Sequence, residues 1–244
     1  MRTILSIFLV LIFTLAVTAY AQEIEKDVIA TSGGDLEIHF LGHATLMFKF
    51  NGVVMHLDPW SRVADYSTLP KADIALLTHD HSDHLDPKAL AQVLRDDTSL
   101  IYTQVCAEMF PGGSVIKQGM SWKVEGIGIE AVAAYTIKIP EKGQSHPEGE
   151  CNGYILTFGD KRIYIASETA NIPELKDIKD IDIAFLAMDS VYNLSPEEAV
   201  DVVKVFAPKV IYPFHYNRAD LSPFISAFEN DPGIEVRIRD MRIR

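Results

Sequence analysis

The chain has 244 residues, a formal net charge of -12 at pH 7 and a hydrophobic content of 48%. The negative charge argues against duplex DNA or RNA as a partner, because phosphate backbones are bound by clusters of Lys and Arg. The length allows one domain to bury a full core without disulfides. We therefore expect a small-molecule substrate rather than a nucleic acid, and the sequence leaves the oligomeric state open.

The first residues have the pattern of a secretory signal peptide. Arg2 precedes an apolar run over residues 4–13, and Ala19-Tyr20-Ala21 supplies a small-residue cleavage site. The run is shorter than the roughly 20 residues that a spanning helix needs, so an uncleaved anchor is only the alternative. We expect residues 1–21 to be removed and a single domain over residues 22–244 to be periplasmic or secreted, without membrane insertion of the mature chain.

Short β-rich runs open this expected domain. They cover residues 36–41, 45–50, 53–57 and 74–77. Asn51-Gly52 lies between the second and third runs and predicts a two-residue hairpin turn. After the fourth run comes a histidine-rich segment, and then Asp86 and Pro87 predict the N-cap and first residue of a helix to about Leu94. The histidines are therefore expected on a strand-to-helix loop.

The second half of the chain has a similar mixture of elements. Short strands alternate with Gly-bounded turns over residues 99–134, and a hairpin is expected around Gly159-Asp160-Lys161. Ser195-Pro196-Glu197-Glu198 predicts a capping box that opens a helix to about Phe206. The remaining expected elements are strands over residues 183–187, 210–212 and 235–238 and a helix from Ser222. The pattern therefore predicts two strand-rich halves, each with helices on its outer side.

Three of the 8 histidines fall within residues 79–84. At the end of a strand, His79 and His81 can turn toward one point, while Asp83 and His84 can face a second point. Imidazole with carboxylate suits zinc, manganese or iron, and two such points about 3.5 to 4 Å apart form a binuclear hydrolytic site. The alternative is a set of solvated loop histidines with Asp83 as a helix cap.

The segment Thr78-His79-Asp80-His81-Ser82-Asp83-His84 resembles the His-x-His-x-Asp-His signature of the metallo-β-lactamase superfamily. Around it the chain resembles the ascorbate-6-phosphate-lactonase-like hydrolases over nearly the whole mature length. The other pieces that carry this likeness are Leu41-Gly42-His43-Ala44, Leu57-Asp58-Pro59-Trp60, Tyr135, His146-Pro147, residues 164–169 and Pro213-Phe214-His215-Tyr216. A shorter likeness reaches the N-acyl phosphatidylethanolamine phospholipase D type. The resemblance implies an α/β fold, a four-layer αββα sandwich.

The same resemblance implies a ligand set for two divalent metal ions. It assigns His79, His81 and His146 to the first ion, and Asp83, His84 and His215 to the second. Relatives bridge the ions with the aspartate of a His-Ala-Gly-Asp-Thr segment, whereas this chain has Ile165-Ala166-Ser167-Glu168-Thr169, so Glu168 stands where aspartate is expected. Asp58 is implied as a group that orients a ligand histidine, and His43 as a second such group or a substrate contact.

Several of these residues have a structural alternative. His146 lies in a polar segment that reads as a loop, so it could be a surface histidine. His215 could be a hydrogen-bonded histidine at a strand end, Asp58 a turn former, Glu168 an exposed turn cap and His43 a structural residue near the first hairpin. His39 and His56 are expected to be structural. Cys106 and Cys151 fit no metal-binding spacing, and they are either a disulfide or buried free thiols.

These observations predict an exported metal-dependent hydrolase, with zinc as the first choice of metal and manganese or iron as alternatives. A coordinated water whose pKa falls to about 7 would provide hydroxide as the nucleophile. Asp83 would accept a hydrogen bond from that water and aim it, and no Gly-x-Ser-x-Gly elbow suggests a serine nucleophile. An ester, a lactone or a phosphodiester-like compound would be the substrate. The rival function, retained because of Glu168, is a non-catalytic metal- or ligand-binding protein on the same fold.

Overall fold

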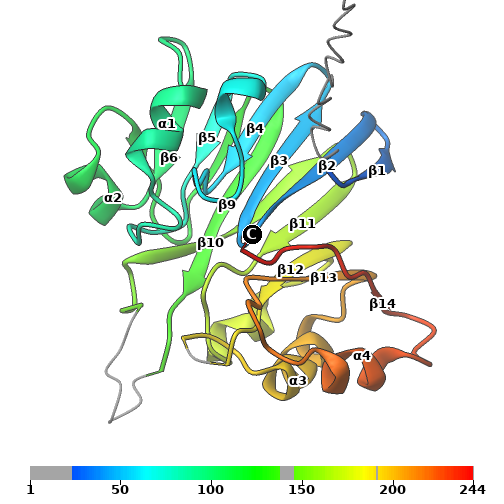
Figure 1. The fold of residues 1–244 in the computed structure, drawn as a ribbon. Helices are drawn as coiled ribbons and strands as arrows, with labels where there is room; N and C mark the ends of the chain where they lie inside the picture. Colours follow the sequence, from blue (N-terminus) through cyan, green and yellow to red (C-terminus); the bar gives the residue numbers. More distant parts are fainter. Residues whose placement is uncertain (1–23, 138–145, 191, 244) are drawn as a thin grey trace, which may run out of the picture.

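The structure is a computed structural model that describes residues 24–137, 146–190 and 192–243 (Figure 1). The expected signal peptide, residues 1–21, lies outside the described residues, so its cleavage stays a prediction. Among the helices of the described ranges, none combines the length and the apolar character needed to cross a membrane.

The first half of the chain forms one seven-stranded sheet, sheet A, in the order β1-β2-β3-β4-β5-β6-β7. Its strands are β1 (Lys26–Thr31), β2 (Gly34–Gly42), β3 (Thr45–Phe50), β4 (Val53–Leu57), β5 (Ile74–Leu76), β6 (Ser99–Tyr102) and β7 (Ser114–Val115). Pairing is antiparallel from β1 to β4 and parallel from β4 to β7. Asn51 and Gly52 have φ of 50° and 85°, the left-handed values that a tight hairpin turn requires, so the hairpin prediction is confirmed.

The second half forms a second seven-stranded sheet, sheet B, in the order β14-β13-β12-β11-β10-β9-β8. Its strands are β8 (Ser121–Val124), β9 (Ile127–Ala134), β10 (Cys151–Phe158), β11 (Lys161–Ile165), β12 (Ile183–Ala187), β13 (Val210–Phe214) and β14 (Glu235–Val236). Pairing is antiparallel from β8 to β11 and parallel from β11 to β14.

Helices lie outside both sheets, as Figure 1 shows. Beside β5 and β6 of sheet A lie α1 (Pro87–Val93) and α2 (Gln104–Met109), and beside β12 and β13 of sheet B lie α3 (Pro196–Phe206) and α4 (Ser222–Phe228). Two 3₁₀ turns complete the described elements, η1 (Tyr66–Thr68) and η2 (Pro173–Asp177). The arrangement is the α/β, four-layer αββα sandwich that the resemblance predicted.

The main core lies between the two sheets. Phe48 of sheet A stacks on Phe158 of sheet B with ring centroids 5.6 Å apart. A second apolar cluster joins sheet A to its helices through Leu77, Leu90 and Cys106, all fully buried. Cys106 and Cys151 are both buried free thiols, so the disulfide alternative is wrong.

The helix starts predicted from the capping residues at Asp86 and Ser195 are confirmed. The Asp86 carboxylate accepts from Lys88 N at the start of α1, and Ser195 forms the full capping box of α3. β1 was not predicted, and residues 99–134 were expected to hold only strands and turns, although α2 lies there. Thr103, whose side chain caps α2, was the available signal. β14 is shorter than the strand expected over residues 235–238.

Candidate metal centre

The candidate site lies where parallel strands of both sheets end. The histidine segment follows β5, Glu168 follows β11, Asp189 follows β12 and His215 follows β13. Because the carboxyl ends of parallel strands meet at the same edge of a sheet, side chains far apart in the sequence converge there. His146 precedes β10 and is buried, with 1% exposure, so the surface-histidine alternative is wrong.

The residues assigned to the first metal form one cluster with Glu168. Ligand atoms of His79, His81, His146 and Glu168 all lie within 4.8 Å of one another. His146 Nε2 is 3.2 Å from His81 Nδ1 and 3.6 Å from Glu168 Oε1. His79 Nε2 is also 3.6 Å from Glu168 Oε1. Three imidazoles and one carboxylate oxygen thus surround one point.

The residues assigned to the second metal form an adjoining cluster. Ligand atoms of Asp83, His84 and His215 lie within 4.8 Å of one another, together with a nitrogen of His43. His84 Nε2 and His215 Nε2 are 3.1 and 3.2 Å from Glu168 Oε1. Glu168 Oε1 therefore lies between both clusters, at the place where a bridging carboxylate is expected. With only 4% of its side chain exposed, Glu168 is not a surface turn cap.

The buried polar atoms of this region fit divalent cations. The Nε2 atoms of His79, His84 and His215 are buried and have no hydrogen-bond partner, although carboxylate oxygens lie near them. A buried nitrogen without a partner loses the hydrogen bond it made with water, which destabilises the fold by about 1 to 3 kcal/mol. Coordination to a metal removes this penalty, and imidazole with carboxylate is the donor set that zinc, manganese and iron accept.

Asp58 is hydrogen-bonded to His84, a residue of the second cluster. Its Oδ2 is 2.7 Å from His84 Nδ1, and its Oδ1 accepts from Thr78 N at 2.8 Å. Thr78 Oγ1 donates to Asp58 Oδ2 at 2.7 Å. A carboxylate that accepts the N–H of a ligand imidazole fixes its tautomer and ring orientation. The contacts are those expected of an orienting group, and Asp58 is more than a turn former.

His43 touches the same cluster from sheet A. Its Nε2 is 2.8 Å from Asp83 Oδ2, and its ring centroid is 3.8 Å from that of His215. Its carbonyl oxygen accepts from His215 N at 2.9 Å, so the two histidine loops are joined by their backbones as well. His39 and His56 lie outside the clusters, bonded to Glu37 and to the carbonyl oxygen of Pro70.

Two residues that were not predicted as site residues, Asp189 and Asn193, also reach the site. Asp189 Oδ2 is 3.5 Å from His215 Nδ1, and Asn193 Nδ2 donates to Glu168 Oε2 at 3.3 Å. Asp189 follows β12 with only Met188 between them, so it lies at the same strand-end edge as the proposed ligands that follow β5, β11 and β13. That pattern was the available signal for Asp189, whereas nothing local marks Asn193.

Strained backbone is concentrated at this edge. The four site residues with positive φ are His43 at 55°, Asp58 at 44°, Ser167 at 58° and His215 at 46°. Left-handed conformations of residues other than glycine destabilise a fold by about 1 to 3 kcal/mol each and persist where the surroundings enforce them. The folded chain thus holds these side chains in fixed directions before any metal binds.

In the metal-free chain, the pKa values of the cluster residues are set by burial and by their neighbours in the clusters. Burial favours a raised pKa for Glu168, but the facing imidazoles, His215 first, hold that pKa well below its usual range. Burial lowers the pKa of His79 to about 4. Burial also opposes protonation of His84, yet Asp58 raises its pKa well above the usual value. A metal must displace such protons, so binding weakens as the pH falls.

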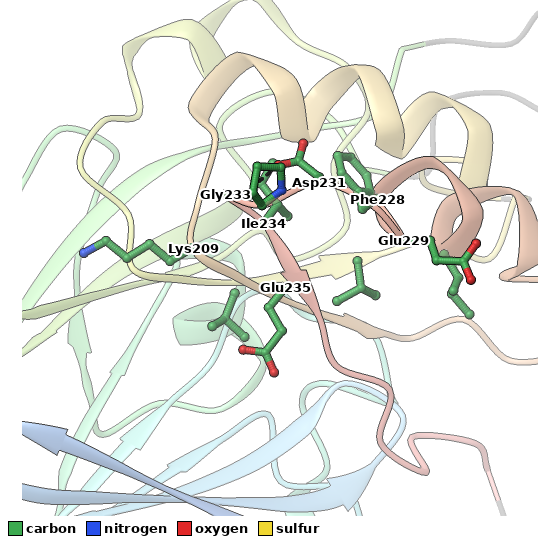
Figure 2. Close-up of a pocket in the computed structure, with 11 residues that line it drawn as sticks. Lys209, Phe228, Glu229, Asp231, Gly233, Ile234 and Glu235 are labelled. Atoms are coloured by element: carbon green, nitrogen blue, oxygen red, sulfur yellow. Dashed lines mark hydrogen bonds between the residues drawn. The ribbon is translucent and has the colours of Figure 1, made fainter.

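A separate pocket lies away from these residues, between α4 and β14 (Figure 2). Its volume is about 570 Å³, and its lining includes Lys209, Phe228, Glu229, Asp231 and Glu235. None of its lining residues is a histidine or a cysteine. The pocket therefore lacks the imidazole and thiol groups that zinc prefers as ligands.

Comparisons with known proteins identify the family of the chain. The family described as "Beta-lactamase superfamily domain" matches residues 37–215. A UPF0173 metal-dependent hydrolase of Enterococcus faecalis is 32% identical over 202 residues, covering 72% of this chain and 84% of the relative.

Solved structures are similar as well. The crystal structure of a "Putative metal-dependent hydrolase" from Parabacteroides distasonis has a TM-score of 0.85 and 40% identity, covering 90% of this chain and 100% of that one. Igni18, a metallo hydrolase from Ignicoccus hospitalis, shares the fold with a TM-score of 0.69 and 23% identity, covering 84% of this chain and 95% of that one. The narrower likeness to the ascorbate-6-phosphate-lactonase-like branch stays a prediction. The chain belongs to the metallo-β-lactamase superfamily of metal-dependent hydrolases.

Proposed function

We propose that this chain is an exported hydrolase that cleaves an ester, a lactone or a phosphodiester-like small molecule at a pair of divalent ions. Zinc is the proposed metal, with manganese or iron as alternatives. The observation that carries the proposal is the position of Glu168 Oε1, which lies 3.1 to 3.6 Å from the Nε2 atoms of four histidines. One carboxylate oxygen between two imidazole clusters is the arrangement that a shared ligand requires.

The proposed ligands follow the two clusters. His79, His81 and His146 would hold one ion, Asp83, His84 and His215 would hold the other, and Glu168 would be shared by both. Bound ions would polarise the attacked carbonyl or phosphoryl oxygen and lower the pKa of a coordinated water to about 7. Asp58 and Asp189 keep ligand imidazoles oriented through their contacts with His84 and His215.

Asp83 is the proposed catalytic carboxylate. Its side chain is 27% exposed, whereas the side chain of Glu168 is 4% exposed, so an incoming water reaches Asp83 more readily. His43 Nε2 fixes Asp83 Oδ2 at 2.8 Å. A carboxylate held in one orientation can accept a hydrogen bond from water and direct its attack.

A substrate panel tests this function. Purified protein would be assayed with nitrophenyl esters, a series of lactones and bis-nitrophenyl phosphate, before and after removal of metal with a chelator. We expect turnover of at least one class, its loss on chelation and its recovery with zinc or manganese. Turnover that resists chelation would contradict the proposal. Metal binding without turnover of any class would favour the non-catalytic binding protein instead.

Export is proposed from the N-terminal pattern alone. Arg2, the apolar run over residues 4–13 and Ala19-Tyr20-Ala21 favour cleavage after Ala21. N-terminal sequencing of protein from its native host should give a chain that begins at Gln22 in the extracytoplasmic fraction. An intact Met1 end in the cytosol would remove the export proposal and make an intracellular substrate the better one.

A further inference from the structure

We infer that Asn193 is a positioning residue that holds the Glu168 carboxylate so that a single oxygen, Oε1, faces the metal clusters. This rests on the proposed metal-dependent function, because it assigns Glu168 as a ligand. Asn193 Nδ2 donates to Glu168 Oε2 at 3.3 Å, on the oxygen that does not face the histidines. The two carboxylate oxygens thus have different partners, an amide on one and imidazoles on the other.

The need for such a partner comes from the length of glutamate. Its side chain has one more rotatable bond than that of aspartate, so its carboxylate has more orientations to lose when it is fixed. Glu168 follows Ser167, whose φ of 58° fixes the direction in which the side chain leaves the backbone. The backbone does not fix rotation about the terminal bond of Glu168, and the hydrogen bond from Asn193 to Oε2 restricts that rotation.

The amide of Asn193 is itself held in one orientation. Its Oδ1 accepts from Asp189 N at 2.7 Å, and a backbone N–H can pair only with an acceptor. The Asn193 oxygen must therefore face Asp189, which directs the NH₂ group toward Glu168. The amide cannot rotate by half a turn without losing both hydrogen bonds.

Asp189 and Asn193 contact two different residues of the site, His215 and Glu168. The Asp189 carboxylate accepts from Tyr192 N at 3.0 Å, which closes the turn. Asp189 Oδ2 also lies 3.5 Å from His215 Nδ1. Asp189 thus contacts His215, and Asn193, which is hydrogen-bonded to Asp189, contacts Glu168, so this pair sets the two proposed ligands relative to each other.

The test is zinc affinity rather than turnover. Zinc dissociation constants would be measured by competition with a chromophoric chelator for the wild-type chain, Asn193→Ala and Asn193→Asp. Loss of a group that orients a ligand weakens metal binding by about 10- to 100-fold. We expect a loss in that range for one ion in Asn193→Ala, and a larger loss in Asn193→Asp, whose carboxylate repels Glu168. Absorption spectra of the cobalt-substituted proteins should change in the same variants.

Two controls make the outcome specific. Asn171→Asp adds the same charge at an exposed position three residues beyond Glu168, and it should leave zinc affinity unchanged. In a Glu168→Asp background the shorter carboxylate lies beyond the reach of Asn193, so Asn193→Ala should add less than a twofold loss. Thermal unfolding of the metal-free variants checks that each one folds.

Two results would overturn the inference while the proposed function stands. In the first, Asn193→Ala binds zinc with wild-type affinity. In the second, Asn193→Ala causes an equally large loss of affinity in the wild-type and Glu168→Asp backgrounds. A wild-type chain that binds no zinc, manganese or iron would overturn both the inference and the proposed function.

Discussion

Single carboxylates orient histidines of the proposed metal clusters. Asp58 receives two hydrogen bonds from Thr78 and one from His84, so one buried side chain fixes both the backbone of the histidine loop and a ligand ring. Its partners lie 20 and 26 residues away in the sequence. The direction of each ring is therefore set by its neighbours, in addition to its own position in the loop.

Asp58→Asn should weaken metal binding without unfolding the chain. An amide has one acceptor oxygen, so it can accept from Thr78 N or from the His84 N–H, whereas the two carboxylate oxygens of Asp58 accept from both. We expect zinc affinity to fall by about 10- to 100-fold, as measured by chelator competition. Asp65→Asn, in the exposed loop before η1, is the matched control and should bind as the wild type does. Equal affinity in the two variants would show that Asp58 does not orient His84.

His81→Ala and Asp83→Asn should each abolish hydrolysis and leave a folded chain. Both side chains lie in the proposed clusters, whereas the core between the sheets is independent of them. Circular dichroism and the assay of the substrate panel would be run side by side. His39→Ala removes a histidine that lies outside the clusters and should keep full activity. Activity in either cluster variant would show that the histidine segment is not the reaction centre.

At the scale of elements, the parallel strands and their following loops carry the site. β5, β11, β12 and β13 each end in a loop that supplies a polar side chain to the clusters. The turn after β12 continues directly into α3, whose capping box begins at Ser195. Ser195, the N-cap of α3, thus follows Asn193 by two residues, and the helix anchors the segment that holds Asn193 beside Glu168.

Ser195→Ala should destabilise the fold through α3. Ser195 Oγ accepts from Glu198 N at 3.1 Å, and Glu198 Oε2 accepts from Ser195 N at 2.8 Å. Loss of an N-cap side chain lowers the free energy of unfolding by about 1 kcal/mol. Urea unfolding of metal-free protein measures this change. Ser222→Ala at the start of α4 changes a serine outside any capping box and should have a smaller effect.

At the scale of the whole molecule, the two sheets bury histidines as well as apolar residues. His56 of β4 is fully buried, and its Nε2 donates to the carbonyl oxygen of Pro70 at 3.0 Å. Burial lowers the pKa of His56 to about 4, from 6.5 in an exposed histidine. The folded state therefore keeps this imidazole neutral in a range where the unfolded chain binds a proton.

This difference should make the fold less stable in mild acid. Between pH 6.5 and about 4 the unfolded state carries the extra proton on His56, so the free energy of unfolding falls as the pH falls through this window. The full contribution is about 3 kcal/mol at most. We expect urea unfolding of metal-free His56→Gln to depend less steeply on pH than the wild type between these limits. Identical slopes would show that His56 titrates normally in the fold.

Features with local causes were predictable from the sequence alone. The His-x-His-x-Asp-His spacing on a strand-to-helix loop, the Asn51-Gly52 turn and the caps at Asp86 and Ser195 each depend on residues a few positions apart. The turn and the caps follow from nearby backbone and side-chain chemistry, whereas the directions of the histidine rings also depend on Asp58, which is distant in the sequence. The missed helix α2 and strand β1 lack a strong signal of this kind, since α2 spans only 6 residues.

The tertiary structure decided which distant groups meet. His43 and Asp83 are 40 residues apart, and Asn193 and Glu168 are 25 residues apart, yet both pairs are hydrogen-bonded. Sequence spacing cannot give such contacts, because they depend on how the two sheets pack and on which parallel strands end side by side. For the same reason the sequence could name Glu168 as a candidate ligand, but only the fold placed its Oε1 between the two clusters and its Oε2 against Asn193.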